Sequence, residues 1–354
     1  VQSHTNGGVH VQAEITSPSP LLDSSGRLTQ VGWSRQPLLD CNLENVSFYR
    51  CRALQPLRVK RWDYYGLTTP ELFFSVTLSH VGYLGLPFIY AVDLATGEMC
   101  EETLLIPFGK GVELARNSTE GACSFDNGRV KIAFTVQGQA RTVRVDWPAF
   151  NRGEGISCDL TMSCPPEHES MVIVTPIASK RFYYNRKTNC LRTTGWIQRG
   201  GRRSEISPDR ALATLDWGRG VWEYKGFWVW ASSSGFLPDG RTLGLNMGYG
   251  FGDTSAATEN AFILDGRVHK LEQVDFEYSS RSFMSPWKMH SPDGRLDLVF
   301  EPFKERVAKS ELLVLSSEVH QMFGRYSGTL KTDEGETLHV ENQVGWAEEH
   351  HAKW

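Results

Sequence analysis

The chain has 354 residues, 40% of them hydrophobic, so it can bury a sizeable core in two domains or in one large β domain. Its formal net charge is −4 and its sequence pI is about 6.2, which argues against a nucleic-acid partner. No apolar run is long enough to cross a bilayer, and no signal-peptide pattern is present, so we expect no transmembrane segment.

The cysteines indicate the redox compartment. There are seven, an odd number, and no two of them stand in a C-x-x-C pair. We therefore predict mostly free thiols and a cytoplasmic protein. Disulfide bonds would instead indicate a secreted protein, and only then would the two N-x-S/T sequons matter.

The first half of the chain has a proline-rich start followed by short alternating runs. Residues 1–45 are predicted to form an extended arm, and 46–180 a first β domain. Apolar runs over 73–81 and 88–94 predict strands. Asn127-Gly128 stands between two alternating runs and predicts a hairpin, because this dipeptide suits the tight turns that join antiparallel strands.

The second half begins at a basic segment, 180–203, where we place the domain boundary, so that 181–354 forms a second β domain. One short helix is predicted over 208–214, since Ser207 suits the N-cap and Pro208 the first helical position. The Asp265-Gly266 turn predicts a hairpin in which Phe262 faces His269 and Leu264 faces Arg267. The last strands are predicted over three ranges, 312–319, 324–331 and 337–344. Short strands with regular turns predict an all-β fold of two barrels or sandwiches, with very little helix.

The stretch 216–264 has two unusual alternating patterns. Between Trp222 and Trp230 the even positions place aromatic side chains on one strand face. Between Leu243 and Asp253 the even positions are glycines, apart from Asn246. A bare face opposite a tryptophan-rich strand could leave a pocket in the second domain, or the glycines could only let closely packed strands coil around a tryptophan core.

Three acids in this stretch are the candidate catalytic residues: Asp216, Asp253 and Glu259. A carboxyl in an apolar pocket can stay protonated and act as an acid. Alternatively, Asp216 and Asp253 cap turns and one of them pairs with Arg219. The candidate substrate-binding residues are Trp217, Arg219, Trp222, Trp228, Trp230, Asn246, Tyr249, Asn260, Trp287 and His290.

No cofactor or metal is predicted. The only cluster of ligand-type residues is Glu348-Glu349-His350-His351, whose neighbours would point to opposite faces of a strand, so we interpret it as a packing or docking element. The sequence has no G-x-S-x-G elbow and no phosphate-binding loop. The glycines between Gly248 and Gly252 precede no long helix, which argues against a dinucleotide site.

Several motifs along almost the whole chain resemble an uncharacterised family of the lipocalin-like (calycin) superfamily. These motifs are PLLD (20–23), GWSR (32–35), DWGRG (216–220), GFGD (250–253), ATEN (257–260), DG (265–266) with HKL (269–271), and GWAEEHHAKW (345–354). Distant relatives include carotenoid 1,2-hydratases, tocopherol cyclases and fungal lipocalin-like decalin cyclases. The resemblance implies two lipocalin-like β domains with an apolar pocket and acid-assisted or cofactor-free chemistry; it assigns no catalytic residue.

Three classes of function follow. The first is a cofactor-free cyclase, isomerase or hydratase acting on a polyene, terpenoid or polyketide, which carboxyls in an enclosed pocket would favour. The second is a carrier of such a ligand, favoured by a wholly apolar pocket. The third is a carbohydrate-active protein, favoured by an open groove with paired carboxyls. We predict the first, with a small hydrophobic partner; a peripheral membrane contact and the oligomeric state stay open.

Overall fold

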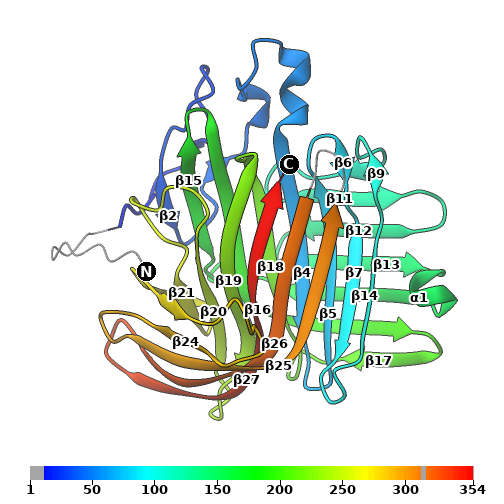
Figure 1. Cartoon of the computed structure of the whole chain (residues 1–354), viewed down its shortest axis with the longest axis vertical. Coiled ribbons are helices and arrows are strands. Elements are labelled where there is room, and N and C mark those ends of the chain that lie inside the picture. The colour runs from blue at the N-terminus through cyan, green and yellow to red at the C-terminus, as the bar shows by residue number, and fades with distance from the viewer. Residues whose placement is uncertain (1–11, 312–315, 354) are drawn as a thin grey trace.

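The computed structural model describes residues 12–311 and 316–353 (Figure 1). Almost all regular elements are strands, and they form two large sheets, each curled into a half-barrel. The helical elements are short: η1 (Leu43–Asn45), η2 (Arg52–Leu57) and α1 (Phe150–Gly153). The predicted fold class, all-β with two lipocalin-like units and very little helix, is confirmed.

The first sheet follows the order β10-β11-β12-β13-β14-β16-β18-β4-β5-β6-β9, and the other strands pair alongside β5, β7, β15 and β16. Its strands are β2 (Gly32–Ser34), β4 (Val59–Thr68), β5 (Leu72–His80), β6 (Leu84–Gly85), β7 (Phe88–Asp93), β8 (Met99–Thr103), β9 (Ile106–Pro107), β10 (Val112–Glu113), β11 (Gly121–Asp126), β12 (Lys131–Gln137), β13 (Ala140–Trp147), β14 (Ile156–Ser163), β15 (Met171–Ala178), β16 (Arg181–Arg199), β17 (Arg202–Ile206) and β18 (Leu212–Val221). A separate parallel pair joins β1 (Ser19–Pro20) to β3 (Leu39–Asp40).

The second sheet follows the order β22-β21-β20-β19-β27-β26-β25-β24-β23, and every neighbouring pair is antiparallel. Its strands are β19 (Lys225–Phe236), β20 (Thr242–Tyr249), β21 (Ala261–Leu264), β22 (Arg267–Lys270), β23 (Asp275–Glu277), β24 (Trp287–His290), β25 (Leu296–Glu311), β26 (Ser316–Lys331) and β27 (Thr337–Lys353). The three last strands are long and lie side by side across the front of the molecule (Figure 1).

Both predicted hairpins are present, and the one at Asp265-Gly266 has the predicted register. In β21 and β22, Phe262 pairs with His269 and Leu264 with Arg267. The Asn127-Gly128 turn joins β11 to β12, and Gly128 takes a φ of 82°, which glycine adopts without strain. Local turn chemistry was therefore enough to set these pairings.

One prediction about the middle of the chain is wrong. The helix over 208–214 does not form, because β18 begins at Leu212 and pairs with β16 on one side and β4 on the other. Pairing on both sides, with all ten residues of β18 buried, outweighs the local helix signals. The basic segment 180–203 is mostly β16, inside the first sheet, and the sheets change only between Val221 and Lys225.

The predicted last strands also differ. Residues 312–315 of the range 312–319 lie outside the described residues. From Ser316 the chain runs as one strand to Lys331, so 324–331 is part of β26 and not a strand of its own. The range 337–344 lies within β27, which continues to Lys353.

The described part of the arm connects the two sheets. Its β2 pairs with β15 of the first sheet. Trp33 of β2 packs in an apolar cluster with Ile173 of the first sheet and with Ile263 and Val268 of the second. How the chain divides into domains stays a prediction, and the sheet pairing favours a division after Val221.

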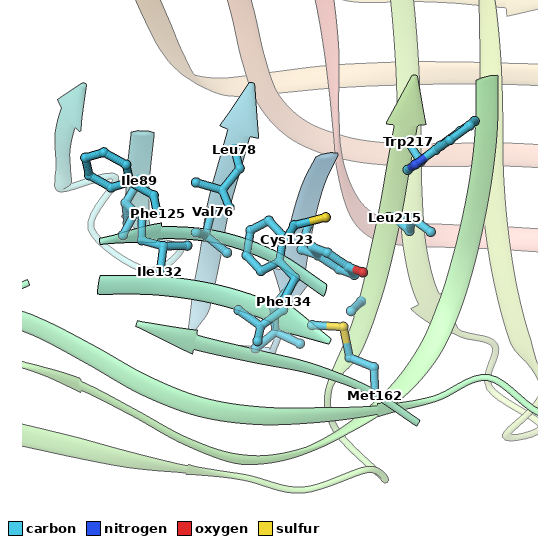
Figure 2. Close-up of a cluster of buried hydrophobic side chains, with 14 of the residues drawn as sticks. Val76, Leu78, Ile89, Cys123, Phe125, Ile132, Phe134, Met162, Leu215 and Trp217 are labelled. Atoms are coloured by element: carbon cyan, nitrogen blue, oxygen red, sulfur yellow. The ribbon is translucent and has the colours of Figure 1, made fainter. Parts of the chain in front are cut away.

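Each sheet has an apolar core of its own, and a third core joins the two sheets. In the first half-barrel, Val76 and Leu78 of β5 lie opposite Phe125 and Phe134 of β11 and β12 (Figure 2). The second sheet encloses the residues around Trp287. Aromatic residues from both sheets form the joining core: Tyr64, Phe73, Tyr90, Trp230, Phe323 and Trp346.

The seven cysteines are all free thiols in this structure, as predicted, and five of them are buried. The cytoplasmic compartment stays a prediction. None of the helices within residues 12–311 and 316–353 has the length and the apolar character needed to span a bilayer.

Candidate functional site

A pocket with a volume of about 180 Å³ lies between the two sheets. Its rim includes the exposed residues Thr103 and Leu105, whereas its closed end is formed by buried side chains. The residues that line it are Trp62, Tyr64, Leu86, Phe88, Tyr90, Glu101, Thr103, Leu105, Tyr183, Lys187, Asp216, Trp222, Trp228, Trp230, Phe251, Glu259, Arg306, Ala308, Ser317, Val319, Gln321, Glu348 and His350.

The pocket is not the barrel interior that the sequence predicted. Val229 and Ala231 of β19 point into the core of the second sheet, whereas Trp228 and Trp230 point to the opposite face and line the pocket. The alternation in β19 was therefore interpreted correctly. The aromatic face of β19 packs against the first sheet, whereas the prediction placed it opposite the glycine face of the second domain.

The first charged group at the closed end is an ion pair. Lys187 of β16 and Asp216 of β18 are direct cross-strand partners, and Lys187 Nζ lies 2.9 Å from Asp216 Oδ2. Both side chains are buried. The ammonium also lies 3.7 Å from the centre of the Trp230 ring, a distance that allows a cation–π interaction. Asn185 donates to the other oxygen of Asp216 at 2.7 Å.

Glu348 of β27 is the second acid at this end. Its cross-strand neighbour Gln321 donates to Oε2 at 2.9 Å, and Trp228 Nε1 donates to Oε1 at 3.3 Å. Burial raises the pKa of Glu348 to about 7, although Lys187 and Arg306 act in the opposite direction. A carboxyl with this pKa can hold a proton near neutral pH and release it there.

Glu259 is the third acid, and it follows the glycine-rich loop after β20. Asn246 Nδ2 donates to the backbone oxygen of Glu259 at 2.8 Å and to Oε2 at 3.3 Å. The Asn246 oxygen in turn accepts a hydrogen bond from Trp230 Nε1 at 2.8 Å. Burial raises the pKa of Glu259, and Lys187 partly offsets the effect.

The glycine face of β20 is filled, not empty. A Cβ at Gly248 would lie 2.8 Å from Glu259 Oε1, and one at Gly244 would lie 2.4 Å from the Cβ of Asn189. The glycines permit close approach by neighbouring groups. At Gly248 the group that approaches is the carboxyl of Glu259.

A second ion pair lies on the far side of the pocket. Arg306 of β25 binds Glu101 of β8 through two hydrogen bonds, of 2.6 and 2.9 Å, and thereby connects the two sheets. Its guanidinium lies 4.3 Å from the centre of the Tyr90 ring. Lys187 and Arg306 are thus each matched by one carboxylate, whereas neither Glu259 nor Glu348 forms an ion pair within the described residues.

Aromatic side chains from both sheets form the walls. The first sheet contributes five aromatic residues, and the Tyr64 and Tyr90 hydroxyls lie 3.2 Å apart. The second sheet contributes Trp228 and Trp230. Trp222 lies just before β19 in the chain, and Phe251 lies just after β20. Trp222 and Phe251 meet edge to face with ring centres 5.4 Å apart. Such walls suit a lipophilic molecule.

The Glu348–His351 cluster alternates across β27, as its spacing indicated. Glu348 and His350 line the pocket, whereas Glu349 accepts a hydrogen bond from Tyr278 on the other face and also contacts His351. Burial lowers the pKa of His350 to about 3, so its ring is neutral, and it lies 2.8 Å from Ser317 Oγ. Within residues 12–311 and 316–353, no three His, Cys, Asp or Glu side chains are grouped so as to hold a metal ion.

The structure brings seven of the predicted site residues together. Asp216, Glu259, Trp222, Trp228 and Trp230 line the pocket. Two others lie directly behind it: Asn246 orients Glu259, and Asn260 accepts a hydrogen bond from the Gly248 amide at 2.8 Å.

Three other predicted residues lie in the core. Trp217 packs inside the first half-barrel, and Trp287 inside the second sheet. Arg219 is fully buried and binds Asp63 at 2.6 Å, so its charge is used within the first half-barrel and not at the pocket.

The last three lie outside the pocket lining. Asp253 is exposed in a turn, where its carboxylate accepts a hydrogen bond from the Ser255 amide, which lowers its pKa. Tyr249 is 39% exposed, and His290 lies 3.7 Å from Asp275. These positions do not bring the three side chains near Glu259.

Sequence reasoning missed four charged residues of the site: Glu101, Lys187, Arg306 and Glu348. Glu348 belongs to the Glu348-Glu349-His350-His351 cluster. Its alternation with His350 indicated that these two side chains share one face of a strand. The pairing of Lys187 with Asp216 depends on the register of β16 against β18. No turn or motif in the sequence predicts this register.

These features define a class of protein: an all-β chain of two curled, lipocalin-like sheets with an aromatic pocket between them. The chain belongs to the family described as domain of unknown function DUF2804, whose profile matches residues 12–354. No curated protein matches the chain.

Two solved structures are similar. A protein assigned as AttH from Nitrosomonas europaea has a TM-score of 0.51 at 15% identity, over 84% of this chain and 92% of its own. Kievitone hydratase from Nectria haematococca has a TM-score of 0.44 at 11% identity, over 83% of this chain and 88% of its own. At these identities the first likeness shows the fold alone.

Proposed function

We propose that this protein is a cofactor-independent enzyme that protonates a carbon–carbon double bond in a lipophilic substrate, in a hydration, isomerisation or cyclisation. The carrying observation is the charge balance of the pocket. Two cations are matched by Asp216 and Glu101, and two further carboxyls, half-buried Glu259 and buried Glu348, have a raised pKa among aromatic walls. Such carboxyls can donate protons near neutral pH.

Glu348 is the proton donor in this proposal, and Glu259 is the second acid–base group. Glu348 is held by Gln321 and Trp228, which fixes the direction of its carboxyl. Asp216 serves better as the partner that keeps Lys187 charged and in place. Asp253, exposed and outside the lining, has no part in the chemistry.

The proposed step balances in charge and atoms. The proton of Glu348 adds to one alkene carbon as the π electrons form the new C–H bond, which leaves a carbocation on the neighbouring carbon. The aromatic walls of the pocket stabilise this cation. Water addition followed by proton loss to ionised Glu259 gives hydration. Attack by a second double bond moves the cation to another carbon, and proton loss from a neighbouring carbon to Glu259 then completes cyclisation. Direct loss of a neighbouring proton to Glu259 gives isomerisation.

Solvent deuterium tests the proposal. Mass spectrometry of lipophilic molecules that co-purify with the protein supplies the substrate, which is then incubated with the enzyme in D₂O. We expect deuterium on carbon in the product. Glu348→Gln keeps the shape but removes the acid, so turnover should fall about 100- to 10,000-fold while binding is retained. Asp253→Asn is the matched control and should keep full turnover.

A carrier function is the alternative that the apolar walls favour. It predicts that the co-purified molecule is returned unchanged and without deuterium. It also predicts that Glu348→Gln and Glu259→Gln bind that molecule as tightly as the wild type does. Full turnover by both variants would instead overturn the acid mechanism. No observation here favours carbohydrate chemistry, because the aromatic rings pack edge to face against one another.

A further inference from the structure

Four exposed apolar side chains lie on chain segments that main-chain contacts join to the pocket. Leu105 lines the pocket and is 47% exposed, and Phe108 is 74% exposed. Tyr224 and Leu54 are 45% and 44% exposed. These four, which we call the rim surface, are half of the eight large exposed apolar side chains in the described residues.

Main-chain contacts hold these segments together at one end of the molecule. The Phe108 amide donates to the Tyr83 oxygen at 2.8 Å, beside the pairing of β6 with β9. Gly82 packs against the backbone of Leu57, where η2, which carries Leu54, ends. The helical turns of η2, the strands β6 and β9, and the end of β27 all lie at the same end (Figure 1).

The segment that carries Tyr224 is attached to the same end. Arg58, the residue after η2, donates to the Trp222 oxygen at 2.9 Å. Trp222 itself lines the pocket. This bond therefore joins the end of η2 to a residue of the pocket wall.

The backbone holds Phe108 outward. Its φ is 55°, a conformation that a bulky residue rarely adopts. The next residue, Gly109, fixes the turn, because a Cβ there would lie 2.1 Å from the His80 ring. Strained conformations of this kind persist where the surrounding structure enforces them, and they gather at functional positions.

Exposed cations accompany the rim surface although the whole chain has a net charge of −4. Arg52 stands two residues from Leu54, Lys110 two residues from Phe108, and Lys225 next to Tyr224, and all three are exposed. Exposed acids nearby are Glu113 and Glu223. Apolar side chains flanked by Lys and Arg are the combination that binds an anionic bilayer surface.

We propose that the rim surface docks this protein onto an anionic phospholipid bilayer, with the pocket mouth facing the lipid. The apolar side chains enter the interface while the cations contact the headgroups. A lipophilic substrate then passes from the bilayer past Leu105 into the pocket without crossing water. This last step rests on the proposed function, whereas the docking itself does not.

Cosedimentation with vesicles tests the docking. Wild-type protein should bind vesicles of phosphatidylcholine mixed with phosphatidylserine, and binding should weaken with added salt because salt screens the cations. Phe108→Ser and Leu105→Ser should each lower the partition coefficient about tenfold, since a large apolar group no longer enters the lipid. Met284→Ser is the control: Met284 is 40% exposed but lies outside the pocket lining.

Several results would overturn the proposal. One is failure of the wild type to bind these vesicles. Another is a loss of vesicle binding in Met284→Ser as large as that in Phe108→Ser. A third is a dimer in sedimentation velocity that Phe108→Ser dissociates, without binding of the wild type to vesicles. Glu348→Gln should dock like the wild type, because its carboxyl lies at the closed end. Docking that persists without any turnover would refute the enzyme and leave the bilayer contact intact.

Discussion

At the scale of single residues, the site depends on how neighbours set the protonation of buried carboxyls. Asp216 lies beside Lys187, whereas Glu348 is buried with two neutral donors, Gln321 and Trp228. Burial without a matched cation disfavours the charged form, so the pKa of Glu348 rises to about 7. Asp216 is thus paired with a cation, whereas Glu348 in the same pocket can hold a proton near neutral pH.

The same burial predicts that Glu348 lowers stability at alkaline pH. Its pKa rises from 4.5 to about 7 on folding, so its contribution is favourable below about pH 4.5 and is lost as the pH rises to about 7. Above that, the ionised group costs roughly 3 kcal/mol. Glu348→Gln should therefore unfold at higher urea concentration than the wild type at about pH 8 and show little gain at about pH 4.

The control for this measurement is Asp253→Asn, whose carboxyl has a lowered pKa and which should show no gain at alkaline pH. A Glu348→Gln variant that is less stable than the wild type at alkaline pH would mean that Lys187 and Arg306 fully compensate the carboxylate. In that case Glu348 would be ionised and unsuited to donate a proton.

At the scale of elements, β19 and β20 divide their faces between core and site. Val229 and Met247 fill the second sheet, while Trp230 and Asn246 face the first sheet and hold Glu259 in place. Gly248 lies on the same face of β20 as Asn246. The missing side chain at that position makes room for a carboxyl that arrives from the following loop.

We predict that Gly248→Ala displaces Glu259. The added Cβ would lie 2.8 Å from both Glu259 Oε1 and the Val229 oxygen, and the backbone oxygen has little freedom to move. Overpacking of this kind typically costs about 1–3 kcal/mol. Urea unfolding measures the loss. Gly226→Ala on β19 is the matched control, since its nearest contact is 3.7 Å and ordinary; an equal loss there would contradict the steric argument.

At the scale of the whole molecule, the two sheets share an aromatic core and enclose the pocket together. Phe323 of β26 is fully buried, and its ring centre lies 4.9 Å from that of Phe73 in the first sheet. Arg306 and Glu101 add a charged contact across the same boundary. The pocket exists only when both sheets are in place.

We predict that Phe323→Ala destabilises both sheets together. Truncation of a buried Phe costs about 3–5 kcal/mol, and here the cavity opens between the sheets. Hydrogen exchange should therefore accelerate in β12 and β13 of the first sheet as well as in β24 and β25 of the second. Tyr249→Ala, an exposed aromatic of the second sheet, is the control. Faster exchange confined to the second sheet would show that the sheets unfold independently.

Sequence by itself determined the strand class and much of the local pairing. Alternation is a property of the strand backbone, so runs such as 73–81 and 88–94 could be assigned without knowing their partners. The Asp265-Gly266 turn set its own hairpin register. The acids Asp216 and Glu259 were found because they stand within the glycine- and tryptophan-rich stretch.

Only the tertiary structure decided which strand faces pack against each other. This packing determined where the pocket lies. Alternation shows that Trp228 and Trp230 share a face, but Glu348 and Tyr64, which contact them, lie more than a hundred residues away in the chain. The helix expected over 208–214 became strand because β4 and β16 pair with it on both sides. Glu348 became an acid of the pocket through burial by distant neighbours, since a pKa depends on surroundings that the chain assembles only on folding.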